Sequence, residues 1–267
     1  METYFEANRE RWDELLRFHV DGGYYDLTGF REGRSSLHGI ELRELGSVSG
    51  KSMLHLMCHF GLDTISWARL GAQVTGVDFS SRSIDFAQRL SQELGIQARF
   101  LCANVYDVSK IVRETYDIVY MSYGVLCWLP DLRRLTETVC NRLDDGGTFF
   151  IADFHPFIWV FDPDNPQELI VKQPYFHKEE PYRFERSGSY AYPSASIEHG
   201  TYYQWQHSIQ DLLHSVLDSG LRITSFKEYP YSVDKLFAFM ERQEDGYYHF
   251  VGERYGLPVM FSLTAEK

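Results

Sequence analysis

The residues best suited to chemistry in this sequence are a glycine and an aspartate that follow two neighbouring apolar segments. Gly61 precedes a segment of helical pattern, so the amides at this helix start can hold a carboxylate. Asp78 ends the next apolar segment, where its carboxylate can accept hydrogen bonds from both hydroxyl groups of a ribose. Alternatively, Asp78 caps the helix expected from Ser81, although Ser80 can serve as that cap instead. The pair predicts a site for a ligand with a sugar and one carboxylate.

The turn that ends at Gly61 has too few glycines for a dinucleotide. It reads Met57-Cys58-His59-Phe60-Gly61, whereas a pyrophosphate needs three glycines so that backbone amides can approach two charged phosphates. An oxidoreductase that uses NAD or FAD is therefore disfavoured. S-adenosylmethionine carries a single carboxylate, so one glycine is enough for it.

Short apolar segments of strand length alternate with amphipathic segments of helix length in the first half of the chain. This alternation is typical of a parallel sheet covered by helices on both faces. The expected strands are 52–57, 73–77, 98–102, 116–121 and 148–152. The expected helices between them are about 62–70, 81–94, 106–112 and 132–143. These units predict an α/β fold with a doubly wound, mostly parallel, seven-stranded sheet.

The order of segments over residues 51–154 resembles that of the class I S-adenosylmethionine-dependent methyltransferases. The stretch LHLMCHFGLDTISWARLGAQVTGVDFS is similar to a subgroup in which histidines occur in the glycine motif. Where the family has an acid and its first two glycines, this chain has His55, Met57 and His59, and Gly61 matches the third glycine. The resemblance implies a Rossmann-like methyltransferase fold and S-adenosylmethionine as the cofactor.

The same resemblance implies roles for individual residues along the cofactor cleft. These are ribose binding for Asp78, adenine contact for Phe79, Ile84, Asn104 and Val105, and contact with the methionine end for Ser122 and Tyr123. The predicted cofactor-binding residues are Met57, His59, Gly61, Asp78, Phe79, Ser80, Ile84, Asn104, Val105 and Ser122. As alternatives, Phe79, Ile84 and Val105 are core residues, and His55 and His59 are hydrogen-bonded residues that take no part in binding.

Methyl transfer to a hydroxyl or a protonated amine requires a base near the fifth strand. His155 follows that strand beside Pro156 and is the leading candidate, while Tyr123 is expected to orient the acceptor or contact the sulfonium. The predicted catalytic residues are thus His155 and Tyr123; the alternatives are a structural role for His155 and a base role for His207. Aromatic residues that suit an acceptor pocket, or else a second hydrophobic layer or a subunit interface, are Phe157, Trp159, Phe161, Tyr175, Phe176, Tyr182, Phe184, Tyr190, Tyr192, Tyr202, Tyr203 and Trp205.

The flanking segments predict one elaborated domain. Residues 1–50 are expected to form a helical lid, and residues 51–267 a methyltransferase domain with insertions at about 155–202 and 231–257. The further elements expected are helices over 4–19, 36–45 and 203–219, and strands over 221–229 and 258–264.

Length, charge and cysteine content limit the partners. The 267 residues fit one domain, and 26 basic against 38 acidic residues give a net charge of −12, which disfavours nucleic acid and anionic membrane. The sequence shows no signal peptide and no apolar run of membrane-spanning length, so a cytoplasmic location is expected. Neither the cysteines nor the histidines and acids match a metal-ligand spacing, so no metal is expected. The cysteines, expected to be reduced core thiols, are Cys58, Cys102, Cys127 and Cys140.

The sequence therefore predicts an enzyme, monomer or homodimer, that transfers a methyl group to an oxygen or nitrogen of a small molecule. The alternative is a non-catalytic protein that binds S-adenosylmethionine or S-adenosylhomocysteine on a methyltransferase scaffold. The histidines in the glycine motif are the reason to keep this alternative.

Overall fold

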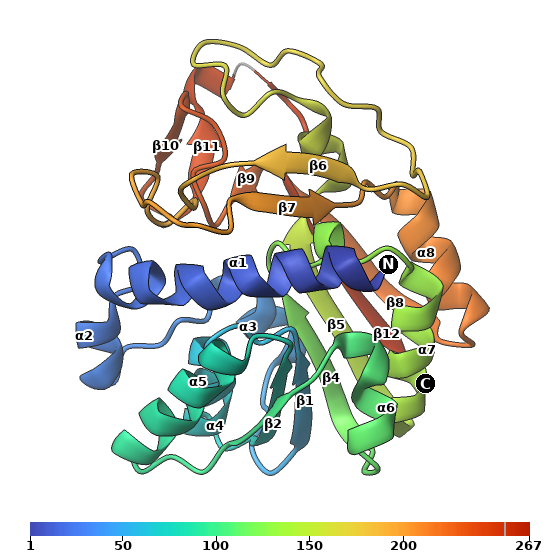
Figure 1. Ribbon diagram of the computed structural model, residues 1–267. Coiled ribbons are helices and arrows are strands. Elements are labelled where there is room, and N and C mark those ends of the chain that lie inside the picture. The colour runs from blue at the N-terminus through green and yellow to red at the C-terminus, as the bar shows by residue number, and fades with distance from the viewer. Residues whose placement is uncertain (254) are drawn as a thin grey trace.

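A single large sheet forms the centre of the computed structural model, which describes residues 1–253 and 255–267 (Figure 1). Its strands are β1 (Ser52–Leu56), β2 (Gln73–Asp78), β3 (Arg99–Cys102), β4 (Tyr116–Ser122), β5 (Leu143–Phe154), β8 (Arg222–Tyr229) and β12 (Met260–Glu266). They lie in the order β3-β2-β1-β4-β5-β12-β8. The first five strands are parallel, and β12 is antiparallel to β5 and β8. The predicted fold class is confirmed.

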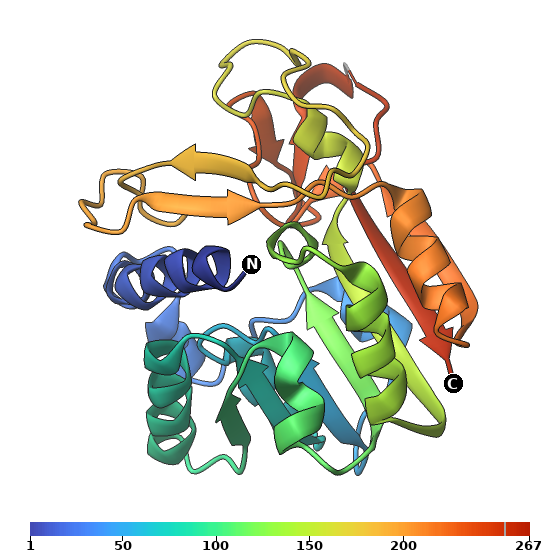
Figure 2. The same ribbon diagram turned by 45° about the vertical axis from the view of Figure 1, so that its right-hand side comes forward.

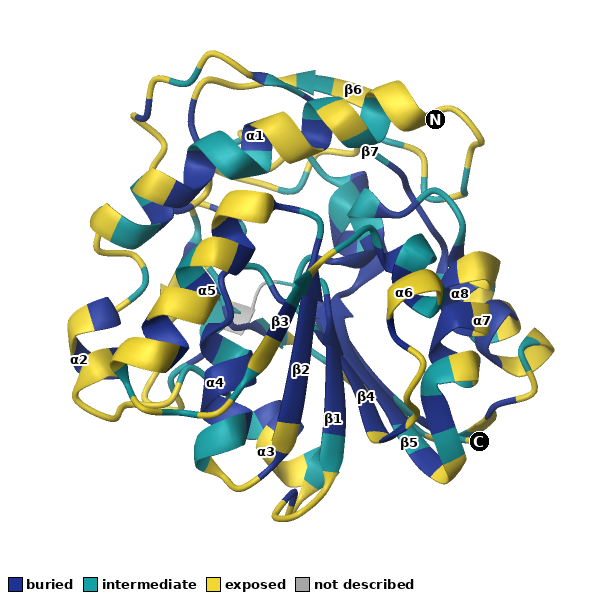
Figure 3. Cartoon of the chain, turned by 60° about the horizontal axis from the view of Figure 1, so that its bottom comes forward, coloured by how far each residue is buried: buried dark blue, intermediate teal, exposed yellow. Residues whose placement is uncertain are grey.

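Helices cover both faces of the sheet. One face carries α3 (Gly39–Leu45), α4 (Leu62–Arg69) and α5 (Ser81–Glu93), and the other carries α6 (Val108–Ile111), α7 (Leu132–Arg142) and α8 (Ile209–Asp218). Successive side chains of a strand point to opposite faces, so Phe149 joins the core under α7 while Phe150 joins the core that contains Trp67. Figure 3 shows the buried strands between these partly exposed helices.

The order of the strands reverses between β1 and β4. The chain runs outward from β1 to β3 and then returns to β4 on the other side of β1. In sheets of this kind a crevice forms at the carboxyl ends of the strands beside the reversal. The turns after β1, β2 and β4 therefore meet at one edge of the sheet.

The first helix lies across this carboxyl edge. α1 (Glu2–Asp21) packs against α5 on one side and against an antiparallel hairpin on the other (Figure 2). The hairpin consists of β6 (Tyr182–Glu185) and β7 (Thr201–Gln204), and the short α2 (Leu27–Arg31) follows α1. The first insertion thus supplies a second layer above the edge.

Polar side chains of α1 bind the backbone of this hairpin. Asn8 donates to the carbonyl of Tyr203 and accepts from its amide, each at 2.8 Å. Arg11 donates to the carbonyls of Gly188 at 2.6 Å and Arg186 at 2.7 Å. Asn8 and Arg11 are almost fully buried, so these bonds satisfy polar groups that have left water.

The helix expected over 203–219 starts later than predicted. Residues 201–204 belong to β7, and α8 begins at Ile209. Ser208 Oγ accepts from the amide of Asp211 at 3.1 Å, and Asp211 Oδ2 accepts from the amide of Ser208 at 2.8 Å. This reciprocal capping fixes the helix start, so the predicted start was wrong.

The second insertion forms a small separate sheet. β9 (Tyr231–Ser232), β10 (Met240–Arg242) and β11 (Tyr248–Phe250) pair antiparallel in the order β10-β11-β9. Short 3-10 turns occur at η1 (Val105–Asp107), η2 (Leu126–Trp128), η3 (Pro156–Val160) and η4 (Val251–Glu253).

Two expectations drawn from composition can be compared with the structure. All four cysteines are free, but Cys58 alone is fully buried and Cys102 is exposed, so the prediction of a core thiol was wrong for Cys102. Within the described residues, no helix has the length and apolar character needed to traverse a bilayer.

Candidate active site

The turn after β1 keeps a glycine-like backbone although it carries side chains. Met57 has a φ of 59°, His59 of 52° and Gly61 of 85°. Positive φ costs energy in residues with a Cβ and is usually maintained where a site requires it. At Gly61 a Cβ would lie 2.8 Å from Ala87 and from Phe100, so glycine is required there by packing as well. The turn therefore has the backbone of a glycine motif with only one glycine.

Asp78 ends β2 directly beside this turn. Its Oδ2 accepts from the amide of His59 and its Oδ1 from the amide of Ser80, both at 2.9 Å. Burial raises the pKa of Asp78 to about 7. Ser80 caps α5, since its Oγ accepts from the amide of Ser83 at 3.1 Å. Asp78 is thus not the cap of the helix, and each carboxylate oxygen keeps a lone pair for a further donor.

Residues of α1 cover the turn and Asp78. Asp13 Oδ1 accepts from Ser80 Oγ at 2.6 Å, and the ring of Trp12 meets the ring of His59 edge-on at 5.1 Å between centroids. His19 Nδ1 lies 3.2 Å from His59 Nε2. Burial lowers the pKa of both imidazoles, that of His19 to about 4, so both are neutral near pH 7. In this structure α1 closes the carboxyl edge above Asp78.

The residues expected around an adenine lie beyond Asp78 along the edge. Phe79 is partly exposed, but Ile84 and Val105 are buried in two different hydrophobic clusters. Asn104 Oδ1 accepts from the amide of Tyr106 at 3.1 Å, which caps η1. The Asn104 oxygen that was predicted to bind the adenine amino group thus already accepts one hydrogen bond from the backbone. It has one lone pair left for a ligand.

The end of β4 brings together two carboxylates that the sequence analysis missed. Ser122 Oγ donates to Asp63 Oδ2 at 3.0 Å. Tyr123, which has a φ of 36°, donates from its hydroxyl to Glu41 Oε2 at 2.6 Å, and the amide of His38 donates to Glu41 Oε1 at 2.6 Å. Burial and the charge of Asp63 raise the pKa of Glu41 to about 8. The only local signal was the position of Asp63 just after Gly61.

The predicted base His155 is engaged by the chain itself. Its Nδ1 accepts from the amide of Phe157 at 3.1 Å, and its Nε2 lies 3.0 Å from Glu228 Oε1 on β8. Burial lowers the pKa of His155, although Glu228 opposes this shift. The ring packs near Phe261 of β12, and this placement favours a structural role.

The rival base His207 is also enclosed. Its Nε2 lies 2.6 Å from the carbonyl oxygen of Leu129, and its ring stacks on His177 with centroids 4.8 Å apart. Burial lowers the pKa of His207 to about 4. Within the described residues no group of three His, Cys, Asp or Glu side chains is arranged to hold a metal ion.

Asp153 fixes the loop that follows β4. Its carboxylate accepts from the amides of Gly124, Val125, Leu126 and Phe154. Burial raises its pKa to about 6, while these donors favour the charged form. The loop beside Tyr123 is therefore held by one buried carboxylate on β5.

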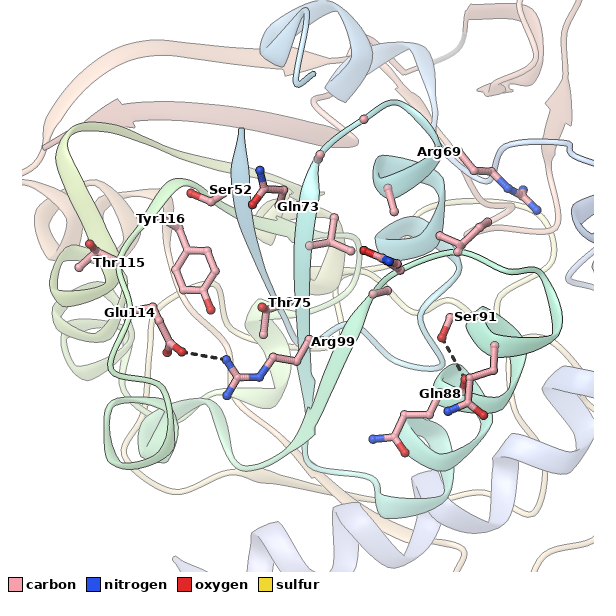
Figure 4. Close-up of a pocket in the computed structure, with 18 residues that line it drawn as sticks. Ser52, Arg69, Gln73, Thr75, Gln88, Ser91, Arg99, Glu114, Thr115 and Tyr116 are labelled. Carbon is pink, nitrogen blue, oxygen red and sulfur yellow. Dashed lines mark hydrogen bonds and ion pairs between the residues drawn. The ribbon is translucent and has the colours of Figure 1, made fainter. Parts of the chain in front are cut away.

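A groove of about 1040 Å³ lies at the opposite edge of the sheet (Figure 4). Ser52, Gln73, Arg99 and Tyr116, which line it, each begin a strand. Figure 4 shows Arg99 paired with Glu114 among the residues that line the groove. This groove is remote from the carboxyl edge and is not part of the site described above.

Comparisons with known proteins identify the kind of domain that this chain contains. A family model described as a methyltransferase domain matches residues 53–147. The magnesium-protoporphyrin O-methyltransferase of Rhodobacter capsulatus is 30% identical over 165 residues, which cover 60% of this chain and 72% of that protein. The ubiquinone biosynthesis O-methyltransferase of Chromobacterium violaceum is 30% identical over 106 residues, 40% of this chain and 45% of that protein.

Solved structures share the fold. An S-adenosylmethionine-dependent methyltransferase from Mesorhizobium loti has a TM-score of 0.61 at 17% identity, covering 89% of this chain and 100% of that chain. The chain spans only about half to two thirds of the length of the ubiquinone biosynthesis O-methyltransferases that it matches. The chain belongs to the class I S-adenosylmethionine-dependent methyltransferases, whose cofactor is S-adenosylmethionine.

Proposed function

We propose that this protein transfers a methyl group from S-adenosylmethionine to an oxygen or nitrogen atom of a small molecule. The observation that carries the proposal is the glycine-like turn at 57–61 facing the carboxylate of Asp78. Amides at the start of α4 are suited to the carboxylate of the cofactor, and Asp78 to its ribose. The O-methyltransferase names of the two relatives above support a small-molecule acceptor.

The bound cofactor supplies a methyl group already activated by a sulfonium. The protein then has to hold the acceptor in line with that methyl group and exclude water. α1 covers the carboxyl edge through Trp12 and Asp13, and this cover suits the exclusion of water. The loop after β4, which Asp153 holds in place, suits the positioning of the acceptor, because it lies beside Tyr123.

The proton of the acceptor is assigned to Tyr123 and Glu41. As the acceptor loses its proton to the phenolic oxygen of Tyr123, the phenolic proton moves to the carboxylate of Glu41. The hydrogen bond of 2.6 Å between these groups supports this path. We prefer it to His155, because both nitrogens of that ring face groups of the chain.

The alternative is a protein that binds the cofactor without turnover. The closed position of α1 over Asp78 and the ring of His59 in the turn favour it. Calorimetric titration with S-adenosylmethionine, followed by measurement of S-adenosylhomocysteine across a panel of phenols, carboxylic acids and amines, separates the two functions. Binding with product formation supports the enzyme, binding without product on any acceptor supports the alternative, and absence of binding overturns both.

A further inference from the structure

Asp63 occupies a position between three parts of the chain that meet at the methionine end of the site. It lies in the first turn of α4, two residues after Gly61. Its Oδ1 accepts from Ser36 Oγ at 2.6 Å and its Oδ2 from Ser122 Oγ at 3.0 Å. These bonds hold the carboxylate beside the end of β4 and leave two of its lone-pair sites without a donor.

The carboxylate of Asp63 lacks a Lys or Arg partner among the residues that the structure describes. Within residues 1–253 and 255–267, neither Lys nor Arg forms an ion pair with it, and Glu41 adds a second carboxylate nearby. Burial raises the pKa of Asp63 and lowers that of the neighbouring His38; the attraction between the two groups opposes both shifts, so the histidine compensates the charge only in part. A desolvated carboxylate is costly unless it is paired, and a cationic group of a ligand provides such a pair.

Tyr120 is a second polar group near Asp63. The hydroxyl of Tyr120 is fully buried and forms no hydrogen bond of good geometry, although Ser122 and Trp67 lie close to it, and both Asp63 and Glu41 act on it electrostatically. Tyr120 belongs to β4 and precedes Ser122 by two residues. A polar group without a well-formed hydrogen bond therefore lies near Asp63, on the side of β4.

His55 does not supply the charge that its position usually carries. It stands where the family resemblance places an acid at the end of the first strand. Its Nδ1 lies 2.8 Å from Thr64 Oγ1, and burial lowers its pKa to about 3, so it is neutral near pH 7. His55 therefore offers no negative charge to the amino-acid end of the cofactor.

We infer that Asp63 provides this charge, by accepting a hydrogen bond from the amino group of S-adenosylmethionine at the end of β4. The inference rests on the proposed function and deepens it, because it assigns the amine subsite of the same cofactor. The family's acid at the position of His55 lies before the turn that follows β1, and Asp63 lies after it. The negative charge therefore stays beside the same turn. Ser36 and Ser122 orient the carboxylate for this contact.

The test compares two ligands that differ only in the amine. S-adenosylhomocysteine and its desamino analogue, which keeps the carboxylate, are titrated by calorimetry into the wild-type protein and into Asp63→Asn. We expect Asp63→Asn to weaken S-adenosylhomocysteine roughly 10- to 100-fold, as for loss of a charged hydrogen bond, and to change the affinity of the analogue less than about twofold. Asp63→Glu should recover part of the loss, and Asp107→Asn, at an exposed ion pair with Lys110, should have no effect.

Each result of this comparison decides the matter. Equal losses of affinity for both ligands in Asp63→Asn mean that Asp63 only maintains the shape of the site. Unchanged binding of S-adenosylhomocysteine means that Asp63 makes no contact with the amine. Either result overturns the inference but leaves the proposed function standing. Binding of the analogue by Asp63→Asn shows that the variant is folded. If the wild-type protein binds neither ligand, the proposed function fails together with the inference.

Discussion

His19 of α1 and His59 of the turn after β1 place their ring nitrogens 3.2 Å apart, with both imidazoles buried and neutral. The second nitrogen of His19 lies 3.1 Å from Ser189 Oγ in the first insertion. One residue of the turn after β1 is thereby connected to the segments that cover this turn. A glycine at position 59 has no side chain with which to form this connection.

The first prediction concerns release of the cofactor product. His59→Gly removes the contact with His19 and relieves a side chain at positive φ, so α1 should separate from the turn more easily. We expect S-adenosylhomocysteine to dissociate about tenfold faster, as for loss of one hydrogen bond. Stopped-flow tryptophan fluorescence measures the rate, with His214→Ala on the exposed side of α8 as the control. An unchanged rate would show that the histidine contact does not retain the ligand.

The second prediction concerns the ribose carboxylate. Asp78→Ala should weaken S-adenosylhomocysteine by about 1 to 3 kcal/mol through lost hydrogen bonds to the sugar. Calorimetry at neutral pH gives the affinity, and Asp85→Ala, on the exposed side of α5, serves as the matched control. Equal affinities of Asp78→Ala and the wild type would remove Asp78 from the site.

The third prediction concerns the pH dependence of turnover on an acceptor found in the panel. Glu41 must be ionised to receive the proton, and its pKa is raised to about 8 by burial and by Asp63, so the rate should rise as pH increases through about 8. Glu41→Gln should flatten this rise, and Tyr123→Phe should lower the rate by about 100-fold. A profile that is the same in the wild type and Glu41→Gln would exclude this path. The other groups that face Glu41 are His38, Asp63 and Tyr120.

The fourth prediction concerns stability against pH. The pKa of Glu41 is higher in the folded chain, at about 8, than its ordinary value of 4.5, so the folded state binds the proton more tightly. The stabilisation from this group is complete below about pH 4.5 and is lost as pH rises through about 8. Urea unfolding at pH 5 and pH 8.5 should therefore show a smaller pH-dependent loss in Glu41→Gln than in the wild type. The same loss in both proteins would contradict the buried position of Glu41.

The fifth prediction concerns the loop after β4. Asp153→Asn replaces a charged acceptor by an amide whose NH2 group meets backbone donors, so it should destabilise the fold by about 2 to 4 kcal/mol. Chemical denaturation measures the change. Asp162→Asn, in an exposed pair with Lys172, should leave the midpoint almost unchanged. Similar midpoints for the two variants would mean that Asp153 does not hold the loop.

Local pattern was sufficient for most of the central sheet and for the cap of α5. The first five strands were predicted within a few residues at most boundaries because their apolar segments are short and are separated by amphipathic helices. β5 is the exception, since it begins at Leu143 before its apolar segment and pairs there with Tyr116. Ser80 was correctly recognised as able to cap α5, since capping depends on neighbouring residues.

Contacts between residues far apart in the sequence could not be predicted from local patterns. Glu41 meets Tyr123 across 82 positions of the sequence, and Asp63 meets Ser122 across 59, so neither pair leaves a local signal. The start of α8 was a different kind of error. Ser208 and Asp211 form a recognisable capping box, but aromatic residues before it were assigned to the helix rather than to β7.

The bonds of Asn8 and Arg11 to the β6–β7 hairpin determine how this protein can open. Breaking them would leave two almost fully buried polar side chains without partners, whereas the aromatic contacts of Trp12 can be exchanged for contacts with a ligand. We therefore expect α1 and the β6–β7 hairpin to move together as one rigid unit. The backbone should bend in the glycine-containing segment at residues 22–26 and in the chain on either side of the hairpin. Shortening the hairpin would then alter how fast the cofactor enters, although the hairpin lies in a different part of the sequence from the turn that we propose binds the cofactor.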